Sequence, residues 1–314
     1  MSLFKCEFDC NSSKNEKIMK ISVKRLLVPT PSGDGQYKNP HYIAYTDWGD
    51  PLNPHVVICV HGMTRNCRDF DYLASALQPN RRVIAVDIVG RGQSDWLEHE
   101  QDYDYYPLYL SDAITLIAHI QSQYQTAVTF DWIGISLGGL IGMILAIQPD
   151  LPVPINKLVM SDIGPLIPEA ALRRIADYVG RDPRFYSFAE FKQYMKAISV
   201  SFGPLTEEQW DHMAIHSARE YEDGSFGFRY DPRIAISFKT HEIRDITLWE
   251  QWDQLAIPTL VLRGAESDVL SASTAKQMQV RGAKAHLVEL AGVGHAPMLM
   301  EEKQIKIVRD FILS

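Results

Sequence analysis

The sequence contains little cysteine, with four residues among 314. They are too few and too scattered for a disulfide framework in a chain of this length: Cys6, Cys10, Cys59 and Cys67. No histidine lies near Cys6 and Cys10, which argues against a metal site there. We therefore expect a reduced compartment and no bound metal.

Long apolar runs and an excess of positive charge are also absent. No window approaches the roughly 18 uninterrupted apolar residues of a transmembrane helix. The first residues are charged throughout and contain no apolar stretch of signal-peptide length, which favours a cytoplasmic protein. The 31 lysines and arginines face 39 acidic residues, giving a net charge of −8. We therefore expect neither nucleic acid nor a membrane surface as a partner.

The composition is typical of a globular protein, with 46% apolar and 22% charged residues. There is no internal repeat and no low-complexity tract, so a disordered chain, a collagen-like chain and a repeat scaffold are excluded. The length suggests about two domains, or one α/β domain that carries an insertion. The sequence gives no indication of oligomeric state.

Short apolar runs alternate with helix-length segments over most of the chain. The runs indicate strands buried on both faces, at residues 55–60, 83–87, 128–133, 157–160, 258–263 and 285–290. Helical spacing occurs between and after them, at residues 70–77, 108–120, 137–147 and 303–312. Two earlier segments, 17–28 and 41–48, indicate a hairpin-like pair of strands. The alternation predicts an α/β fold with a mostly parallel central sheet flanked by helices.

Residues 165–253 break this rhythm, because they contain no buried-strand signal. Their helical patterns lie at 170–179, 188–198 and 207–218, which predicts a helical cap over one end of the sheet. The expected organisation is a polar tail at 1–16, a core at 17–164 and 254–314, and a cap at 165–253. The cap is rich in aromatic residues, most of which we expect to form its own small core and about a third to line a pocket.

The strongest chemical signal is the segment Gly134-Ile135-Ser136-Leu137-Gly138, directly between a predicted strand and an apolar helix. Such a sharp reversal strains its central residue and requires neighbours with almost no side chain. Gly134 and Gly138 meet that requirement. The turn would present the Ser136 hydroxyl above the sheet, next to a helix N-terminus. We predict that Ser136 is a nucleophile.

A serine nucleophile needs a base, because its hydroxyl is scarcely ionised near neutral pH. His295 follows the last predicted strand in a glycine-flanked loop, at the same sheet edge as Ser136. His212 and His216 have the i, i+4 spacing of a metal pair, but no glutamate-flanked pattern accompanies them. We predict His295 as the base and expect His212 and His216 on the solvent side of a cap helix.

The base in turn needs a carboxylate that fixes its tautomer. Asp268 follows the strand at 258–263 and precedes His295, which makes it the first choice. Asp162 follows the strand before the cap and is a real rival, and Glu266 is a weaker one.

The segment His61-Gly62-Met63-Thr64 ends a buried strand at a turn that glycine permits. We predict an oxyanion hole made by the backbone N–H groups of Met63 and Leu137. His61 is expected to be a structural hydrogen-bonding residue. Arg65 and Asn66 either reach a substrate or face solvent.

A further glycine segment, Gly90-Arg91-Gly92-Gln93-Ser94-Asp95, has the first two glycines of a dinucleotide-binding motif but lacks the third. No helix pattern opens there, so we interpret it as a structural turn.

Taken together, HGMT, GISLGG, GAESD and GVGHAP in this order resemble the α/β-hydrolase family, over nearly the whole chain from about Tyr42. The resemblance implies that the helical insertion is the family's cap and that the catalytic residues follow the order Ser136, Asp268, His295. The segment DIVGRGQSD is similar to a turn of the epoxide-hydrolase-like branch. Members of that branch that form alkyl esters carry aspartate at the nucleophile position, so Ser136 argues against epoxide hydrolase and dehalogenase activity.

These residues predict a cofactor-free serine hydrolase that cleaves a carboxylic ester of a small to medium apolar substrate through an acyl-enzyme. Lactonase and thioesterase activities are close variants. The alternatives are hydrolysis of a carbon–carbon bond in a ring-cleavage product, a perhydrolase side reaction, or a ligand-binding receptor without catalysis. The complete set of catalytic residues argues against the receptor.

Overall fold

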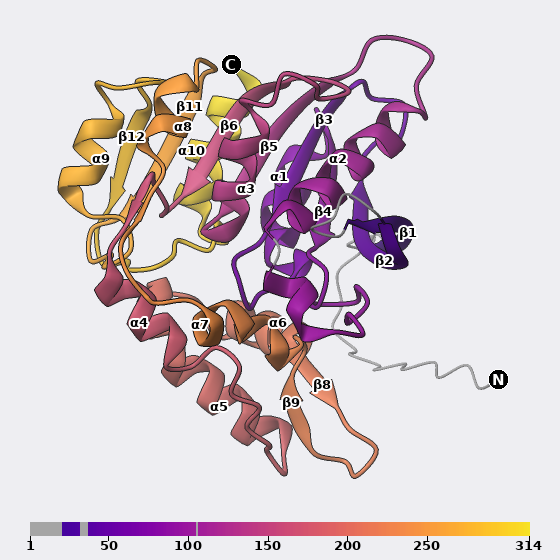
Figure 1. The fold of residues 1–314 in the computed structure, drawn as a ribbon, viewed down its shortest axis with the longest axis vertical. Coiled ribbons are helices and arrows are strands. Elements are labelled where there is room, and N and C mark those ends of the chain that lie inside the picture. The colour runs from indigo at the N-terminus through magenta and orange to yellow at the C-terminus, as the bar shows by residue number, and fades with distance from the viewer. Residues whose placement is uncertain (1–20, 32–36, 105) are drawn as a thin grey trace, which may run out of the picture.

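The fold is built on one eight-stranded sheet, seen in a computed structural model that describes residues 21–31, 37–104 and 106–314 (Figure 1). The strand order is β1-β2-β4-β3-β5-β6-β11-β12. β1 and β2 are antiparallel, β2 is antiparallel to β4, and the remaining neighbours are parallel. The strands are β1 (Ser22–Pro31), β2 (Tyr37–Trp48), β3 (His55–Val60), β4 (Arg82–Asp87), β5 (Thr129–Ile135), β6 (Ile155–Ser161), β11 (Thr259–Gly264) and β12 (His286–Leu290).

Helices cover both faces of the sheet, which is why its central strands are mostly buried and apolar. Successive residues of a strand point to opposite faces. In β3, Val56 and Ile58 belong to the core layer under α2 (Pro107–Gln121) and α3 (Leu137–Leu145). Val57 and Cys59 belong to the layer under α1 (Asp71–Leu77) and α10 (Glu302–Leu313). The predicted α/β fold is confirmed.

The chain leaves the sheet after β6 and returns at β11. We keep the name cap for residues 165–253. The cap contains α4 (Glu169–Ala176), α5 (Phe188–Ile198), α6 (Glu207–Ser217) and α7 (Ile236–Thr240), which lie beyond one end of the sheet in Figure 1. β7 (Leu166–Ile167) pairs with β10 (Ile246–Thr247), so the outgoing and returning segments are tied together. α8 (Trp249–Gln254) spans the predicted cap boundary and packs against α3 of the core.

Local sequence signals explain where the cap elements begin. Thr206 and Gln209 form a capping box at the start of α6, and the Ser187 side chain accepts the N–H of Glu190 at the start of α5.

A hairpin of β8 (Ala218–Glu220) and β9 (Phe226–Phe228) packs on α5. Aromatic rings cluster between the hairpin and α5 as the cap's own core: Phe185, Phe188, Phe191, Tyr194, Phe226 and Phe228.

The predicted tail at 1–16 and the first part of the predicted strand at 17–28 lie outside the described residues. Among the helices that the structure describes, none has the length and apolar character needed to cross a membrane. One described helix, α9 (Ala272–Met278), lies between β11 and β12 and had no counterpart among the predicted helices.

The close contact between α3 and β3 generates a stability prediction. A Cβ at Gly138 would lie 2.0 Å from the Val60 carbonyl oxygen, so Gly138→Ala forces the helix away from the sheet. We expect its free energy of unfolding to fall by about 3 kcal/mol or more. Gly224→Ala is the control, because its Cβ would meet nothing within 4 Å and only the positive φ of 77° opposes it. That substitution should cost about 1–2 kcal/mol. Equal losses in urea unfolding would contradict the close-packing argument.

Candidate active site

Ser136 occupies the turn between β5 and α3 in a strained conformation, with φ 51° and ψ −115°. Its N–H donates to the Ser161 carbonyl at the end of β6, with N···O 2.9 Å. A Cβ at Gly134 would lie 2.2 Å from the backbone of Gly138, so the turn closes only because both positions are glycine. The strained turn predicted from the sequence is therefore present.

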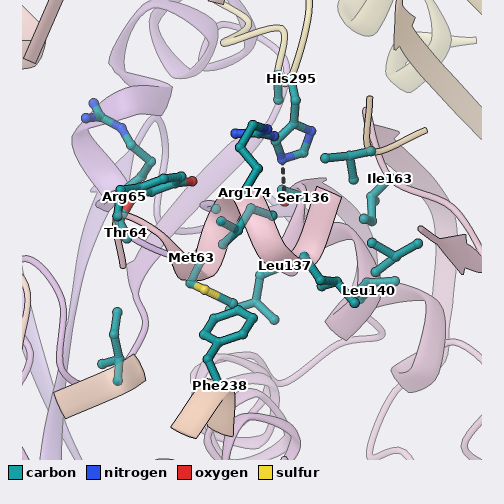
Figure 2. A pocket seen from close by; sticks show the side chains of 18 of the residues that line it. Met63, Thr64, Arg65, Ser136, Leu137, Leu140, Ile163, Arg174, Phe238 and His295 are labelled. Carbon is teal, nitrogen blue, oxygen red and sulfur yellow. Dashed lines mark hydrogen bonds between the residues drawn. The ribbon is translucent and has the colours of Figure 1, made fainter. Parts of the chain in front are cut away.

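The Ser136 side chain lies at the start of a hydrogen-bonded relay (Figure 2). Ser136 Oγ is 2.9 Å from His295 Nε2, and His295 Nδ1 is 2.8 Å from Asp162 Oδ2. Because a carboxylate only accepts, Nδ1 carries the proton toward Asp162. Nε2 is then free to accept the Ser136 hydroxyl proton. This is the geometry in which a serine becomes a nucleophile.

Asp162 is held rigidly for this contact. It is fully buried, directly follows β6 and has a positive φ of 54°. Its carboxylate accepts the Gly264 N–H at 2.8 Å and the Ser267 hydroxyl at 2.5 Å, in addition to the His295 ring. Three donors on one buried carboxylate compensate for its removal from water.

The predicted pairing of Asp268 with His295 is wrong. Asp268 lies four residues beyond the end of β11, and its carboxylate accepts Nε and Nη2 of Arg174 on α4, at 2.5 and 2.9 Å. Asp162 directly follows β6, the strand that pairs with β5 and ends beside the Ser136 turn. The rival acid in the sequence therefore occupies the position that we expected Asp268 to take.

The two predicted oxyanion donors lie at the Ser136 turn. Leu137 is the first residue of α3, so its N–H has no acceptor within the helix. The turn that carries Met63 is close to Ser136, since a Cβ at Gly62 would lie 3.6 Å from the Ser136 Cβ.

His61 fixes the peptide group that contains the Met63 N–H. It is fully buried, its Nδ1 donates to the Gly62 carbonyl at 2.6 Å, and its Nε2 accepts the Ile88 N–H at 3.0 Å. The Gly62 carbonyl also accepts the Arg65 N–H at 3.2 Å. Because the peptide is planar, holding the carbonyl also aims the Met63 N–H. Burial lowers the pKa of His61 to about 3, consistent with a neutral structural residue.

Ser136 and His295 line a cavity of about 470 Å³ between the core and the cap. Most of its lining is apolar and comes from both parts of the chain, including Leu140, Ile163, Ile167, Leu172, Phe202 and Phe238. Among the cap aromatics, Tyr178, Phe202, Phe228 and Phe238 line this cavity. The site can hold a small to medium apolar ligand against the relay.

Other residues singled out in the sequence have structural contacts. Arg65 lines the cavity, but its guanidinium is bound to Asp69 and to the Ser217 hydroxyl. The Asn66 side chain accepts the N–H of Arg68 and donates to a cap carbonyl. In the glycine segment 90–95, a Cβ at Gly92 would lie 2.2 Å from the carboxylate of a buried aspartate, as expected for a structural turn.

The expectation that His212 and His216 face solvent is wrong. Both are partly buried where α6 meets the core, and His212 Nε2 lies 2.8 Å from the Arg68 carbonyl oxygen. Their ring nitrogens and a carboxylate oxygen of Asp71 lie within 4.8 Å of one another. The Arg68 guanidinium already binds Asp71 and approaches His216 at 3.5 Å, so its positive charge opposes a cation there. We interpret the group as a core–cap contact.

Sequence reasoning missed two cap residues at this site. Arg174 binds Asp268 and lines the cavity. The Ser201 hydroxyl donates to the His295 carbonyl at 2.7 Å, and its own carbonyl accepts the Gly294 N–H at 2.7 Å. Neither lies in a motif, and the folding of the cap over the sheet brings Arg174 to the cavity and Ser201 to the His295 loop.

Comparison with known proteins identifies the family. A model described as the alpha/beta hydrolase family matches residues 57–306. A 3-hydroxybutyrate-oligomer hydrolase from Cupriavidus necator is 42% identical over 279 residues, or 86% of this chain and 92% of the relative. The chain therefore belongs to the α/β-hydrolase family.

Two solved structures support this at the level of the fold. A protein from Rickettsia typhi described as a hydrolase shares 30% identity and a TM-score of 0.85, covering 93% of this chain and 99% of its own. An α/β hydrolase from Novosphingobium aromaticivorans shares 31% identity and a TM-score of 0.79, covering 94% and 98%. The predicted enzyme class, a hydrolase acting on ester bonds, is confirmed. The narrower likeness to the epoxide-hydrolase-like branch stays a prediction.

The two aspartates give the sharpest test of the relay. Asp162→Asn should preserve the shape but favour the wrong His295 tautomer, lowering kcat up to about 10⁴-fold by analogy with serine proteases. Asp268→Asn removes a partner of Arg174 and leaves the relay in place, so its loss should be far smaller. Both variants are assayed on one p-nitrophenyl ester at saturating concentration. A larger loss in Asp268→Asn would reassign the acid.

The buried state of His61 generates a pH prediction. Below its ordinary pKa of about 6.5, His61 binds a proton in the unfolded chain but not in the native one, until pH falls to about 3. Its burial therefore costs stability as pH falls, by up to about 1.4 kcal/mol per pH unit. His61→Gln removes this dependence. The difference in unfolding free energy between wild type and variant should shrink by about 2–3 kcal/mol from pH 7 to 4.5. A pH-independent difference in urea unfolding would refute the neutral His61.

Proposed function

We propose that this chain hydrolyses short oligoesters of a hydroxy acid through an acyl-enzyme on Ser136. The observation that carries the proposal is the relay Ser136 Oγ, His295, Asp162 at one wall of a largely apolar cavity. His295 is the base in this proposal, Asp162 is the acid that orients it, and the cap forms the substrate-binding wall.

The chemistry follows from the donor and acceptor roles of these groups. His295 Nε2 takes the Ser136 proton as Oγ attacks the ester carbonyl carbon. The N–H groups of Met63 and Leu137 would stabilise the oxyanion, each contributing on the order of 3 kcal/mol to the transition state. The protonated His295 then gives its proton to the departing alkoxide. Water, deprotonated by the same ring, releases the acid and restores Ser136.

The substrate class rests on the relative and on the cavity together. The Cupriavidus necator relative is named for oligomers of 3-hydroxybutyrate, and it aligns with most of this chain. A cavity of about 470 Å³ lies in the range of small-molecule sites, and its branched aliphatic and aromatic walls suit short methyl-bearing units. The substrate is accordingly a small molecule, and no step in this mechanism requires a metal or an organic cofactor.

This proposal predicts that Ser136→Ala folds like the wild type and loses almost all turnover. The wild type should cleave the dimer and trimer of 3-hydroxybutyrate as well as p-nitrophenyl butyrate, with release of free 3-hydroxybutyrate measured by chromatography. A receptor would complete at most a few turnovers on any ester. Sustained cleavage of p-nitrophenyl butyrate without cleavage of the oligomers would reject the substrate class, and more than a few per cent residual activity in Ser136→Ala would reject the nucleophile.

A further inference from the structure

Arg174 brings an available cation into the wall of a largely apolar cavity. It belongs to α4 of the cap and lines the same cavity as Ser136 and His295, and Figure 2 shows its side chain extending toward that pair. Its guanidinium binds Asp268 through two nitrogens, and the two side chains are 46% and 47% exposed. An ion pair with this exposure is weak, because water and other anions compete for it.

The other arginines of the cavity are less suited to bind a ligand near Ser136. Arg65 is 8% exposed and is held by Asp69 and Ser217. Arg91 is 1% exposed and donates to the Met63 and Val89 carbonyls. The Arg244 side chain is 76% exposed and lies 3.7 Å from Glu242, so its donors lie mostly in solvent and not in the cavity. Arg174 therefore combines a place in the cavity wall with donors that a ligand can compete for.

The proposed substrate carries an anion close to its scissile bond. In an oligoester of a 3-hydroxy acid, the terminal unit has a free carboxylate two carbons from the ester oxygen. Placing that carboxylate among apolar side chains costs free energy unless a cation or several donors pair with it. A guanidinium is well matched to it, because its planar donors bind both carboxylate oxygens.

We propose that Arg174 binds the free carboxylate of the leaving hydroxy-acid unit and so selects acids over neutral esters. This inference rests on the proposed oligoester function for its substrate, but its central claim is the recognition of a carboxylate. Asp268 holds the Arg174 side chain at the cavity before substrate arrives, and the substrate carboxylate takes over part of the guanidinium. The aspartate that the sequence favoured as the catalytic acid thereby serves the specificity of the site.

The experiment compares Arg174→Gln with Arg173→Gln. Arg173 is the neighbouring residue on α4, is exposed, and pairs with Glu169 one turn away, so it controls for loss of one positive charge on this helix. The substrates are the 3-hydroxybutyrate dimer and the methyl ester of the dimer. In Arg174→Gln the ratio of kcat/KM for the acid to kcat/KM for the methyl ester should fall about 10- to 100-fold. Arg173→Gln should retain the wild-type ratio.

A second measurement does not depend on the oligoester being a substrate. Free 3-hydroxybutyrate and its methyl ester are compared as competitive inhibitors of p-nitrophenyl butyrate hydrolysis. We expect the acid to inhibit the wild type more strongly than the ester, and Arg174→Gln to remove that preference. Added salt should weaken the acid's inhibition of the wild type, because the carboxylate–guanidinium contact is partly exposed.

The outcomes separate the two proposals. If the wild type cleaves p-nitrophenyl butyrate but not the dimer, while Arg174→Gln still abolishes the acid's advantage as an inhibitor, the oligoester function fails and the carboxylate site stands. If Arg174→Gln leaves both the substrate ratio and the inhibitor preference at wild-type values, the role of Arg174 is refuted. Equal effects of Arg173→Gln and Arg174→Gln would also refute it, because they would reflect the charge of the helix.

Discussion

The tight reversal of the chain at Ser136 is the constraint on which the rest of the site depends. It gives Ser136 a positive φ of 51° and requires α3 to pass close over β3 and β5. A Cβ at Gly138 would lie 2.0 Å from the Val60 carbonyl oxygen. The Trp132 indole N–H donates to the Gly138 carbonyl at 2.9 Å and holds the helix in that place. The Ser136 N–H binds the end of β6. The strain is therefore opposed by packing and hydrogen bonds from two strands.

This same arrangement explains why the proposed catalytic groups converge. Parallel strands bring their carboxyl ends to one edge of the sheet, and β5, β6 and β12 deliver Ser136, Asp162 and the loop of His295 to that edge. The cap then closes over the edge and contributes apolar walls. Ser201 binds the Gly294 N–H and the His295 carbonyl, so the cap also helps to position the His295 loop. The core supplies the proposed chemistry, and the cap shapes the substrate space.

Much of the architecture could be predicted, because its signals are local. The helix predicted at 188–198 coincides with α5, where hydrophobic spacing and an N-cap serine act over a few neighbouring residues. The strands were recognisable because burial on both faces demands continuous apolar runs. Predicted ends differed by a few residues, as for β5, which continues to Ile135. The solvent-side assignment of His212 failed because the spacing within a helix does not reveal which neighbour covers each face.

The sheet, the helical insertion and the strained serine turn could be recognised from the sequence alone, since each depends on residue size, spacing and apolar pattern over short distances. The sequence also placed His295 beside that turn, because strand order brings both loops to one edge. Only the tertiary structure chose between Asp162 and Asp268 for the contact with His295. Both aspartates follow neighbouring strands, and no local pattern distinguishes them. The choice was made by the donors around each carboxylate: Gly264 and Ser267 hold Asp162 against the ring, while Arg174, which is distant in sequence, draws Asp268 to the cap.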